Sequence, residues 1–267
     1  MIHPTAVIHP RALIDSSVVV GPYAVIDENV TIGARCTIGP HVHITGNTSI
    51  GASNHIHTGA VLGDAPQDLK YDGQPTRLRI GSHNVIREHV TIHRSTKVAE
   101  ETRIGSHNLL MAHCHVGHNV ILGDLVIIAN GALLGGYVTV EDRAFISGNC
   151  LVHQFVTVGM LALMQGGAAI SKDLPPFTVA RGDNAICGLN VVGLRRAGYG
   201  LEQRRELKRL YHILFRGPKN LGHALAEVAN EPWGEGGTRL ISFVRQSKRG
   251  VCQDSSYEAD GSDPATP

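Results

Sequence analysis

The amino-acid sequence predicts a parallel β-helix built from six-residue repeats and followed by a smaller helical domain. First, an aliphatic residue occupies almost every sixth position from Ile2 to Ile170, and of these 29 positions only Asp68 and Gln74 are polar. Second, a small or β-branched residue commonly follows each aliphatic by four positions. Third, glycine often comes directly after the aliphatic. A period of six fits neither an amphipathic helix nor an alternating strand, but it is typical of β-helix hexapeptides.

Each hexapeptide is expected to form a short strand and a corner, so three hexapeptides make one triangular coil. The aliphatic and the small residue point inward, and glycine permits the backbone conformation at the corners. About nine such coils, each roughly 4.8 Å from the next, account for the repeat. We therefore assign residues 1–175 to the column and expect residues eighteen positions apart to be stacked neighbours.

Two polar segments interrupt the repeat, at residues 64–79 (DAPQDLKYDGQPTRLR) and 93–103 (HRSTKVAEETR). The first contains Pro66, Gly73 and Pro75, which favour turns over strands. We predict that both segments are loops extruded from the column. Such loops carry functional residues more often than the elements that they connect.

The repeat stops at Pro175 and Pro176, and residues 176–252 are expected to form a helical domain. The segment LEQRRELKRLYHILF (201–215) has apolar residues at helical spacing, and NLGHALAEVAN and TRLISFVRQS are two further predicted helices. Residues 253–267 are polar and without a pattern, so they are predicted to be a disordered tail.

Composition limits the function classes. A net charge of +1 argues against a nucleic-acid-binding protein, and no apolar stretch is long enough to cross a membrane. The first residues lack the features of a signal peptide. Five scattered cysteines without CxxC spacing suit a reducing cytoplasm. Of the 24 basic residues, 12 lie between Arg195 and Arg249, where there are only five acidic residues.

The segment MAHCHVGHNV (111–120) concentrates three histidines, and the repeat predicts where one of them lies. His118 follows the inward Val116 by two positions, so it belongs to a corner. The eighteen-residue register stacks His118, Gly136 and Gln154 in one column, with the outer two about 10 Å apart. An imidazole, a bare backbone N–H and an amide around a gap could serve as the base, oxyanion donor and binding group of an acyl-transfer site.

Two simpler interpretations of these histidines stay open from spacing alone. In the first, the histidines are ordinary polar side chains on the surface of a repeat protein. The other is a zinc site, which needs convergent ligands. His113, His115 and His118 lie along one rung and cannot converge on a metal without another chain, so we predict no metal.

A set of short motifs connects the chain to a known family. They occur in one order: QDLKY (67–71), VTIHR (90–94), HVGH (115–118), VHQF (152–155), DLPPF (173–177) and GLNVVGLRR (188–196). With the helical C-terminus, they resemble the bacterial UDP-N-acetylglucosamine acyltransferases over about residues 2–250. The resemblance implies a left-handed β-helix and the first step of lipid A synthesis. In that step a 3-hydroxyacyl chain passes from acyl carrier protein to the glucosamine 3-position of UDP-N-acetylglucosamine.

The resemblance also implies residue roles. His118 matches the general base, for which a histidine is suited by its pKa near neutrality, and the N–H of Gly136 matches the oxyanion donor. Further matches are Asp68, Lys70, His93 and His115 around the sugar and phosphates, His153 and Gln154 along the cleft, Gly166 at the acyl-length limit, and Asn190 and Arg196 at the uridine and ribose.

The same resemblance implies a cytoplasmic homotrimer whose cleft lies between adjacent columns. It implies no bound cofactor, because phosphopantetheine arrives on the carrier protein. Basic residues of the predicted helix 201–215 are expected to attract that acidic partner. They are Arg204, Arg205, Lys208 and Arg209, with Arg216 and Lys219 continuing the positive field beyond the helix end.

Four positions depart from the family pattern: Asn119 stands where an Asp is usual, Tyr137 replaces a His, Val192 an acid and Ala197 an Arg. An amide can orient an imidazole but does not stabilise imidazolium as a carboxylate does. The last two departures bear on uridine binding and on the acceptor.

Three alternatives remain open from the sequence: a 3-amino sugar acceptor, a γ-type carbonic anhydrase with zinc held between chains, and a non-catalytic trimeric scaffold.

Overall fold

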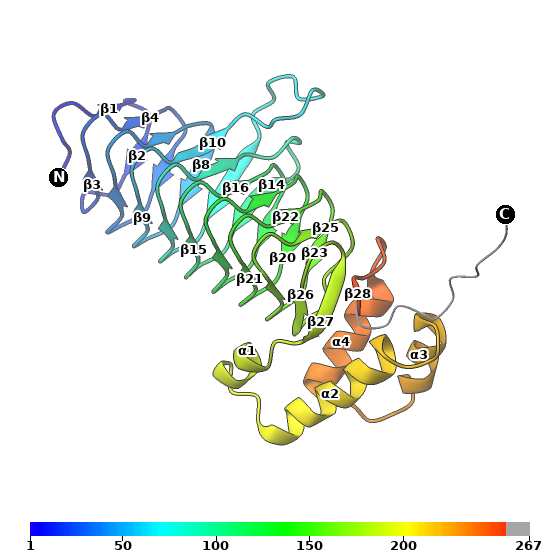
Figure 1. Cartoon of the computed structure of the whole chain (residues 1–267). Helices are drawn as coiled ribbons and strands as arrows, with labels where there is room; N and C mark the ends of the chain where they lie inside the picture. The colour runs from blue at the N-terminus through cyan, green and yellow to red at the C-terminus, as the bar shows by residue number, and fades with distance from the viewer. Residues whose placement is uncertain (255–267) are drawn as a thin grey trace.

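The computed structural model of the chain describes residues 1–254. They form a triangular column of short strands with four helices at its C-terminal end (Figure 1). Each coil contributes one strand to each of three sheets, which have nine, eight and eleven strands and are parallel except for one antiparallel pair near the C-terminal end of the eleven-stranded sheet. The column is a left-handed parallel β-helix followed by helices, so the predicted fold class is confirmed.

The three sheets contain the following strands. The nine-stranded sheet has β1 (Val7–Ile8), β4 (Val25–Ile26), β7 (His43–Ile44), β10 (Val61–Asp64), β13 (Thr91–His93), β16 (His115–Val116), β19 (Leu133–Leu134), β22 (Leu151–Val152) and β25 (Ala169–Ile170). The eight-stranded sheet has β2 (Leu13–Ile14), β5 (Thr31–Ile32), β8 (Asn47–Ile50), β11 (Arg77–Ile80), β14 (Glu101–Ile104), β17 (Ile121–Leu122), β20 (Thr139–Val140) and β23 (Thr157–Val158). The eleven-stranded sheet has β3 (Val19–Val20), β6 (Thr37–Ile38), β9 (His55–Ile56), β12 (Val85–Ile86), β15 (Leu109–Leu110), β18 (Ile127–Ile128), β21 (Phe145–Ile146), β24 (Leu163–Met164), β26 (Thr178–Ala180), β27 (Ala185–Leu189) and β28 (Gln253–Asp254).

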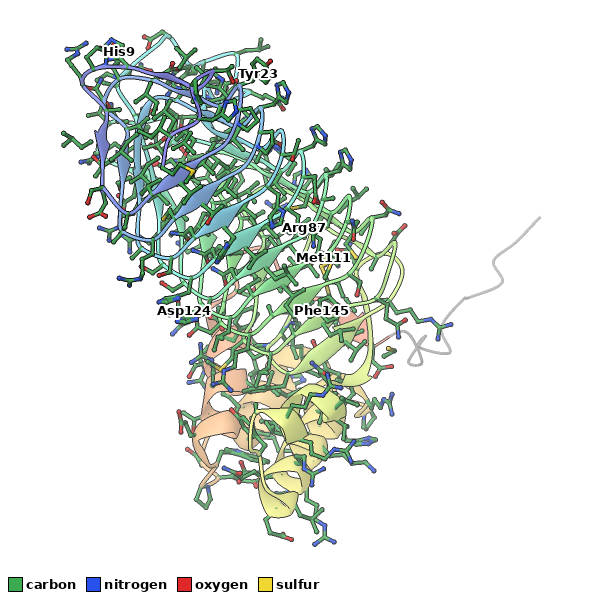
Figure 2. The ribbon with its side chains drawn as sticks, turned by 90° about the vertical axis from the view of Figure 1, so that its left-hand side faces the viewer. His9, Tyr23, Arg87, Met111, Asp124 and Phe145 are labelled. Atoms are coloured by element: carbon green, nitrogen blue, oxygen red, sulfur yellow. The ribbon has the colours of Figure 1, made fainter. Side chains whose placement is uncertain are left out.

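The core of the column is filled by the inward aliphatic residues, while the outward side chains line its faces over its full length (Figure 2). Three inward positions carry asparagine, which the repeat pattern does not anticipate. Asn54 Oδ1 accepts hydrogen bonds from Asn84 N and Nδ2 at 2.9 and 3.0 Å, and Asn84 Oδ1 accepts one from Asn108 N at 2.9 Å. These buried amides are tolerated because each bonds to the next coil.

The register of eighteen holds except across the two extruded loops. Leu62 pairs with Ile92, thirty positions on, and Ile80 pairs with Ile104, twenty-four positions on. Both intervals are multiples of six, so the aliphatic residues remain at every sixth position. The first loop nevertheless removes two hexapeptides from the column, and the second loop removes one. Val98 fits that count, yet it lies in a loop and is half-exposed. The stacking interval predicted from the sequence is therefore wrong at these coils.

The two loops are shorter than predicted. The first spans 65–76 rather than 64–79, and the second 94–100 rather than 93–103, because the flanking residues already pair in strands β10, β11, β13 and β14. Both loops leave the column at the corner between the nine- and eight-stranded sheets. The same corner carries His118 after β16. The two loops therefore lie two coils and one coil before the predicted site, on its N-terminal side.

The C-terminal part contains α1 (Val191–Arg196), α2 (Leu201–Phe215), α3 (Leu221–Val228) and α4 (Glu235–Gln246). The bounds of α2 match the predicted helix. The predicted boundary at 175/176 is displaced, because β26 pairs with β24 and β27 continues the same sheet. Within residues 1–254 no helix is long and apolar enough to cross a membrane.

The predicted disordered tail is wrong for its first two residues. Gln253 and Asp254 form β28, which pairs with β27. The buried Asp254 carboxylate accepts hydrogen bonds from the Tyr211 hydroxyl and from Arg216 Nε, the latter at 2.7 Å. A polar segment was expected to be solvated, but these two partners hold its carboxylate inside. Residues 255–267 lie outside the described part of the chain.

Candidate active site

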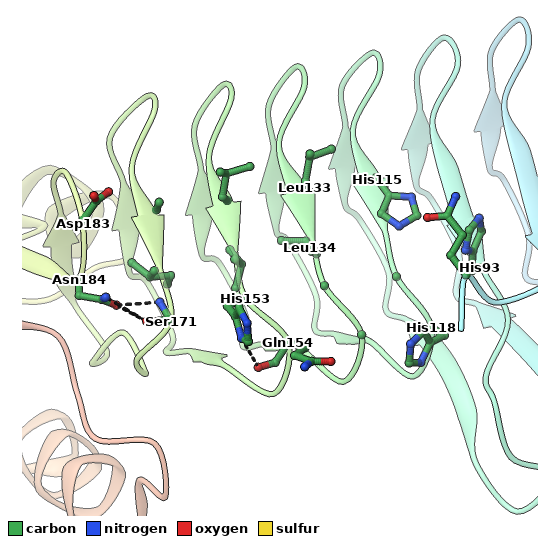
Figure 3. Close-up of a pocket in the computed structure, with 18 residues that line it drawn as sticks. His93, His115, His118, Leu133, Leu134, His153, Gln154, Ser171, Asp183 and Asn184 are labelled. Atoms are coloured by element: carbon green, nitrogen blue, oxygen red, sulfur yellow. Dashed lines mark hydrogen bonds between the residues drawn. The ribbon is translucent and has the colours of Figure 1, made fainter. Parts of the chain in front are cut away.

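A cleft of about 690 Å³ runs along the outer face of the nine-stranded sheet, beside the corner that carries His118 (Figure 3). Six predicted site residues meet there: His93, His115, His118, Gly136, His153 and Gln154. They come from successive coils, because the repeat places one corner above the next. The column of three predicted from the spacing therefore does face a cleft.

His118 and Gly136 are closer than stacking alone requires. A Cβ atom at Gly136 would lie 2.4 Å from Cε1 and 2.5 Å from Nε2 of His118, so only glycine leaves room for the imidazole. The gap expected between His118 and Gln154 is thus occupied by the His118 ring itself. The N–H of Gly136 makes no hydrogen bond with any residue in 1–254, so it is available to a ligand.

The hydrogen bonds behind His118 fix its tautomer. Asn119 Oδ1 faces the backbone N–H of Thr96 at 3.0 Å, and Asn119 Nδ2 faces the Glu100 carboxylate at 2.6 Å. An N–H only donates and a carboxylate only accepts, so the orientation of this amide is determined. His118 Nδ1 lies 3.0 Å from Asn119 Oδ1 and must donate its proton there. In the neutral ring, Nε2 then carries the lone pair, at the position that touches Gly136.

Two further imidazoles, those of His93 and His115, adjoin His118 and have lowered pKa values. Burial, with His93 and His118 beside it, lowers the pKa of His115 to about 4. Burial also lowers the pKa of His93, against the opposing effect of the Asp64 carboxylate. The two rings meet edge to face at 4.9 Å, and His115 Nδ1 shares a hydrogen bond with Thr91 Oγ1 at 2.7 Å. Nδ1 of His93 is buried without a partner within residues 1–254, which leaves it for a ligand.

Asp68 and Lys70 do not line this cleft. Both lie on the loop 65–76, which projects away from the column in Figure 1, and Asp68 Oδ1 accepts a hydrogen bond from Lys70 N at 2.9 Å. Gln67, which precedes them in the same motif, does reach the cleft. Of this motif only Gln67 therefore lines the cleft of its own chain, and Asp68 and Lys70 do not.

Gly166, Asn190 and Arg196 also lie apart from His118. Gly166 is at the corner between the eleven- and nine-stranded sheets, where an added Cβ would meet only Gly148 O at 3.6 Å. Asn190 caps α1, accepting from Gly193 N at 2.9 Å and donating to Leu161 O at 2.9 Å. Arg196 is exposed in the last turn of that helix. Their roles toward substrate stay predictions.

Sequence reasoning missed several cleft residues. Leu133 and Leu151, exposed by 44% and 49%, form an apolar wall, and their stacking at outward positions was a signal in the repeat. Asn184 and Asp183 line the far end, and Asn184 Oδ1 accepts from Ser171 N at 2.7 Å. These last residues follow the repeat, so no register predicts where they lie.

Fold and site together define a class. A left-handed hexapeptide column with a histidine lone pair, an unpaired glycine N–H and an apolar wall at one cleft is an acyltransferase of the hexapeptide-repeat type.

Comparison with known proteins identifies the family. Residues 173–252 match the model for domain 2 of UDP-N-acetylglucosamine O-acyltransferase, and 11–46 and 101–136 match the six-repeat bacterial transferase hexapeptide model. The chain is 43% identical to the acyl-[acyl-carrier-protein]–UDP-N-acetylglucosamine O-acyltransferase of Herminiimonas arsenicoxydans and 46% identical to that of Myxococcus xanthus. Each alignment covers 94% of this chain and 98% of the relative.

Solved structures agree. The UDP-N-acetylglucosamine acyltransferase of Bacteroides fragilis superposes with a TM-score of 0.91 at 39% identity, over 94% of this chain and 99% of that one. The Acinetobacter baumannii structure gives a TM-score of 0.90 at 38% identity, with the same coverage. The chain belongs to the UDP-N-acetylglucosamine acyltransferase family.

Proposed function

We propose that this protein transfers a 3-hydroxyacyl chain from acyl carrier protein to the 3-hydroxyl of UDP-N-acetylglucosamine, the step that begins lipid A synthesis. Its relatives carry the carrier protein, the sugar nucleotide and O-acyl transfer in their names. The observation that carries the proposal is the free lone pair of His118 Nε2 beside the unpaired N–H of Gly136.

The proposed reaction uses His118 to accept and return a proton and Gly136 to stabilise negative charge. Nε2 of His118 accepts the proton of the sugar 3-hydroxyl while its oxygen bonds to the thioester carbonyl carbon. The N–H of Gly136 donates to the oxyanion that develops. When the tetrahedral intermediate collapses, the C–S bond breaks and the imidazolium returns its proton to the departing thiolate of phosphopantetheine. The atoms and charges balance without a bound cofactor or metal.

The apolar wall favours this reaction over the zinc enzyme. Leu133 and Leu151 offer aliphatic surface along the cleft, which suits a long acyl chain rather than carbon dioxide, the small substrate of a carbonic anhydrase. The 3-amino acceptor differs by one atom, and the product distinguishes it, since it would contain an amide in place of an ester.

We further infer that the protein works as a homotrimer in the cytoplasm. The trimer is supported by Asp68 and Lys70, because their loop projects from the column and neither residue lines the cleft of its own chain. The cytoplasm is supported by five free thiols, which suit a reducing compartment. Acyl carrier protein and the UDP-sugar are the proposed partners.

Substitution of His118 tests the proposal directly. His118→Ala is expected to lower kcat by about 100-fold or more, the scale of a lost general base, with little change in sugar-nucleotide KM. His113→Ala is the matched control, because His113 is exposed and stacks on His89 at another corner. Wild-type enzyme dialysed against EDTA should retain its activity, and mass spectrometry should find an ester. Normal turnover by His118→Ala would remove the proposed base.

A further inference from the structure

A hydrogen-bond network that contains the Glu100 carboxylate lies behind His118, the proposed base. Asn119, whose side chain receives the His118 Nδ1 proton, is 7% exposed and occupies the left-handed region at φ 58°. Its Nδ2 donates to Oε2 of Glu100 at 2.6 Å. Its Oδ1 also accepts from both the N–H and the hydroxyl of Thr96, each at 3.0 Å. The path from the imidazole to a full negative charge is thus two hydrogen bonds long.

The extruded loop 94–100 builds this network. It leaves the column one coil before His118 at the same corner, so its residues lie beside that coil's turn. Thr96 also shares a hydrogen bond with the Tyr137 hydroxyl at 3.0 Å, and Asn119 N donates to Thr102 Oγ1 at 2.8 Å. These bonds hold the amide in one orientation between the imidazole and the carboxylate.

We propose that Glu100 is a positioning residue that supplies, through the Asn119 amide, the negative charge that supports His118 during turnover. The inference rests on the proposed role of His118 as general base. Hydrogen bonding to a carboxylate at Nδ2 pushes electron density toward Oδ1, and chains of hydrogen bonds polarise one another in this way. A more negative Oδ1 holds the Nδ1 proton more firmly and stabilises the imidazolium that forms when Nε2 accepts a proton.

The two oxygens of Glu100 have separate partners. Oε2 faces the shielded Asn119 amide, whereas Oε1 bonds at 3.1 Å to the exposed Lys97 ammonium. The lysine therefore shares part of the charge from the solvent side without interrupting the path to His118. An aspartate at position 119 would face Glu100 with like charge and without a donor, so Asn119 and Glu100 form a coupled pair.

Reciprocal substitutions test the inference. Glu100→Gln keeps an acceptor for Asn119 but removes the charge, and should lower kcat about tenfold while sugar-nucleotide KM stays within about twofold. Asn119→Asp alone should also lower kcat, because two carboxylates then face each other. The double variant Glu100→Gln/Asn119→Asp should be more active than either single variant, since a carboxylate now adjoins Nδ1 and the glutamine amide donates to it.

The controls separate charge from loop structure and from the proposed function. Lys97→Met breaks the other bond of Glu100 and should leave kcat near the wild-type value. A role in loop structure alone would instead make Lys97→Met as harmful as Glu100→Gln and would give no rescue in the double variant. Wild-type kcat in Glu100→Gln would also overturn the inference. His118→Ala, measured in parallel, reports on the base itself: full activity there would mean that the proposed function has failed.

Discussion

Burial in the wall of the cleft, with His93 and His118 beside it, lowers the pKa of His115, which therefore keeps a neutral imidazole next to the proposed base. A protonated ring at this position would place a cation beside the imidazolium that the proposed reaction forms on His118. The lowered pKa values of His93 and His115 mean that neither ring adds a positive charge beside His118, the proposed base. Neutral rings also remain able to accept a hydrogen bond from a sugar hydroxyl.

The same shift predicts acid sensitivity. The folded-state pKa of His115, about 4, lies below the ordinary value of 6.5 expected in the unfolded chain. As the pH falls below 6.5 the unfolded chain binds a proton that the folded chain does not, so stability is lost from about pH 6.5 down to about pH 4. The loss is at most about 1.4 kcal/mol per pH unit for this group.

Urea unfolding at pH 7 and pH 5 measures this loss. His115→Gln cannot be protonated, so its free energy of unfolding should fall by about 1–2 kcal/mol less than that of the wild type over this interval. His113→Gln is the matched control, since His113 is exposed at a corner. Equal acid sensitivity of His115→Gln and the wild type would contradict a neutral His115.

Residue-level prediction from the sequence succeeded where translation along the column decides position. His118, Gly136 and Gln154 follow from one register because parallel strands repeat the same corner. Glu100 and Asn119 could not be paired in that way, since Glu100 lies in the extruded loop 94–100 and the conformation of that loop sets the contact. Asn190 is the N-cap of α1, and its position directly before that helix in the sequence is itself typical of an N-cap.

At the scale of elements, α2 differs from its predicted role in one respect. Arg216 and Lys219 were expected to extend its positive field, but this expectation is wrong because Arg216 pairs with Asp254 and Lys219 with Glu227. Arg205 and Arg209 are paired as well, with Glu202 and Glu231. Within residues 1–254, Arg204 and Lys208 have no ion pair.

These two residues make α2 a candidate docking helix. Arg204 and Lys208 lie one turn apart and line a groove of about 400 Å³ together with Leu189, Leu194 and Leu201. Reversing both to Glu should raise KM for acyl carrier protein several-fold and leave the sugar-nucleotide KM nearly unchanged, because rim charges act mostly on encounter. Salt should reduce the difference in carrier-protein KM between the wild type and this variant, because the Debye length shrinks to about 3 Å at 1 M.

Steady-state kinetics with each substrate varied in turn makes the measurement. The control reverses Arg11 and Arg35 of the N-terminal coils, which changes the net charge by the same amount far from α2. A similar rise in carrier-protein KM in the control would reduce the effect to net charge. A rise in both KM values for the α2 variant would instead indicate damage to the site.

At the scale of the whole molecule, the single chain holds only part of its predicted site. The six-residue period determined the column and its corner, since each coil needs only its neighbours. It could not determine which chain supplies Asp68 and Lys70, because a loop that projects from the column has no partner within its own repeat. The cleft of one chain and the loop of the next would complete each other in a trimer.

Mixed trimers test this arrangement. Lys70→Ala should raise the sugar-nucleotide KM, because an ammonium near a diphosphate contributes mainly binding, while His118→Ala removes the base. If loop and cleft come from different chains, co-expressing the two variants creates some sites that contain both Lys70 and His118. Activity at low sugar-nucleotide concentration should then exceed that of either variant alone. Were both residues supplied by one chain, every site in the mixture would lack one of them and no activity would return.

Sedimentation equilibrium at micromolar concentration should give about three times the chain mass of 28.6 kDa, whereas a stable active monomer would exclude the shared site.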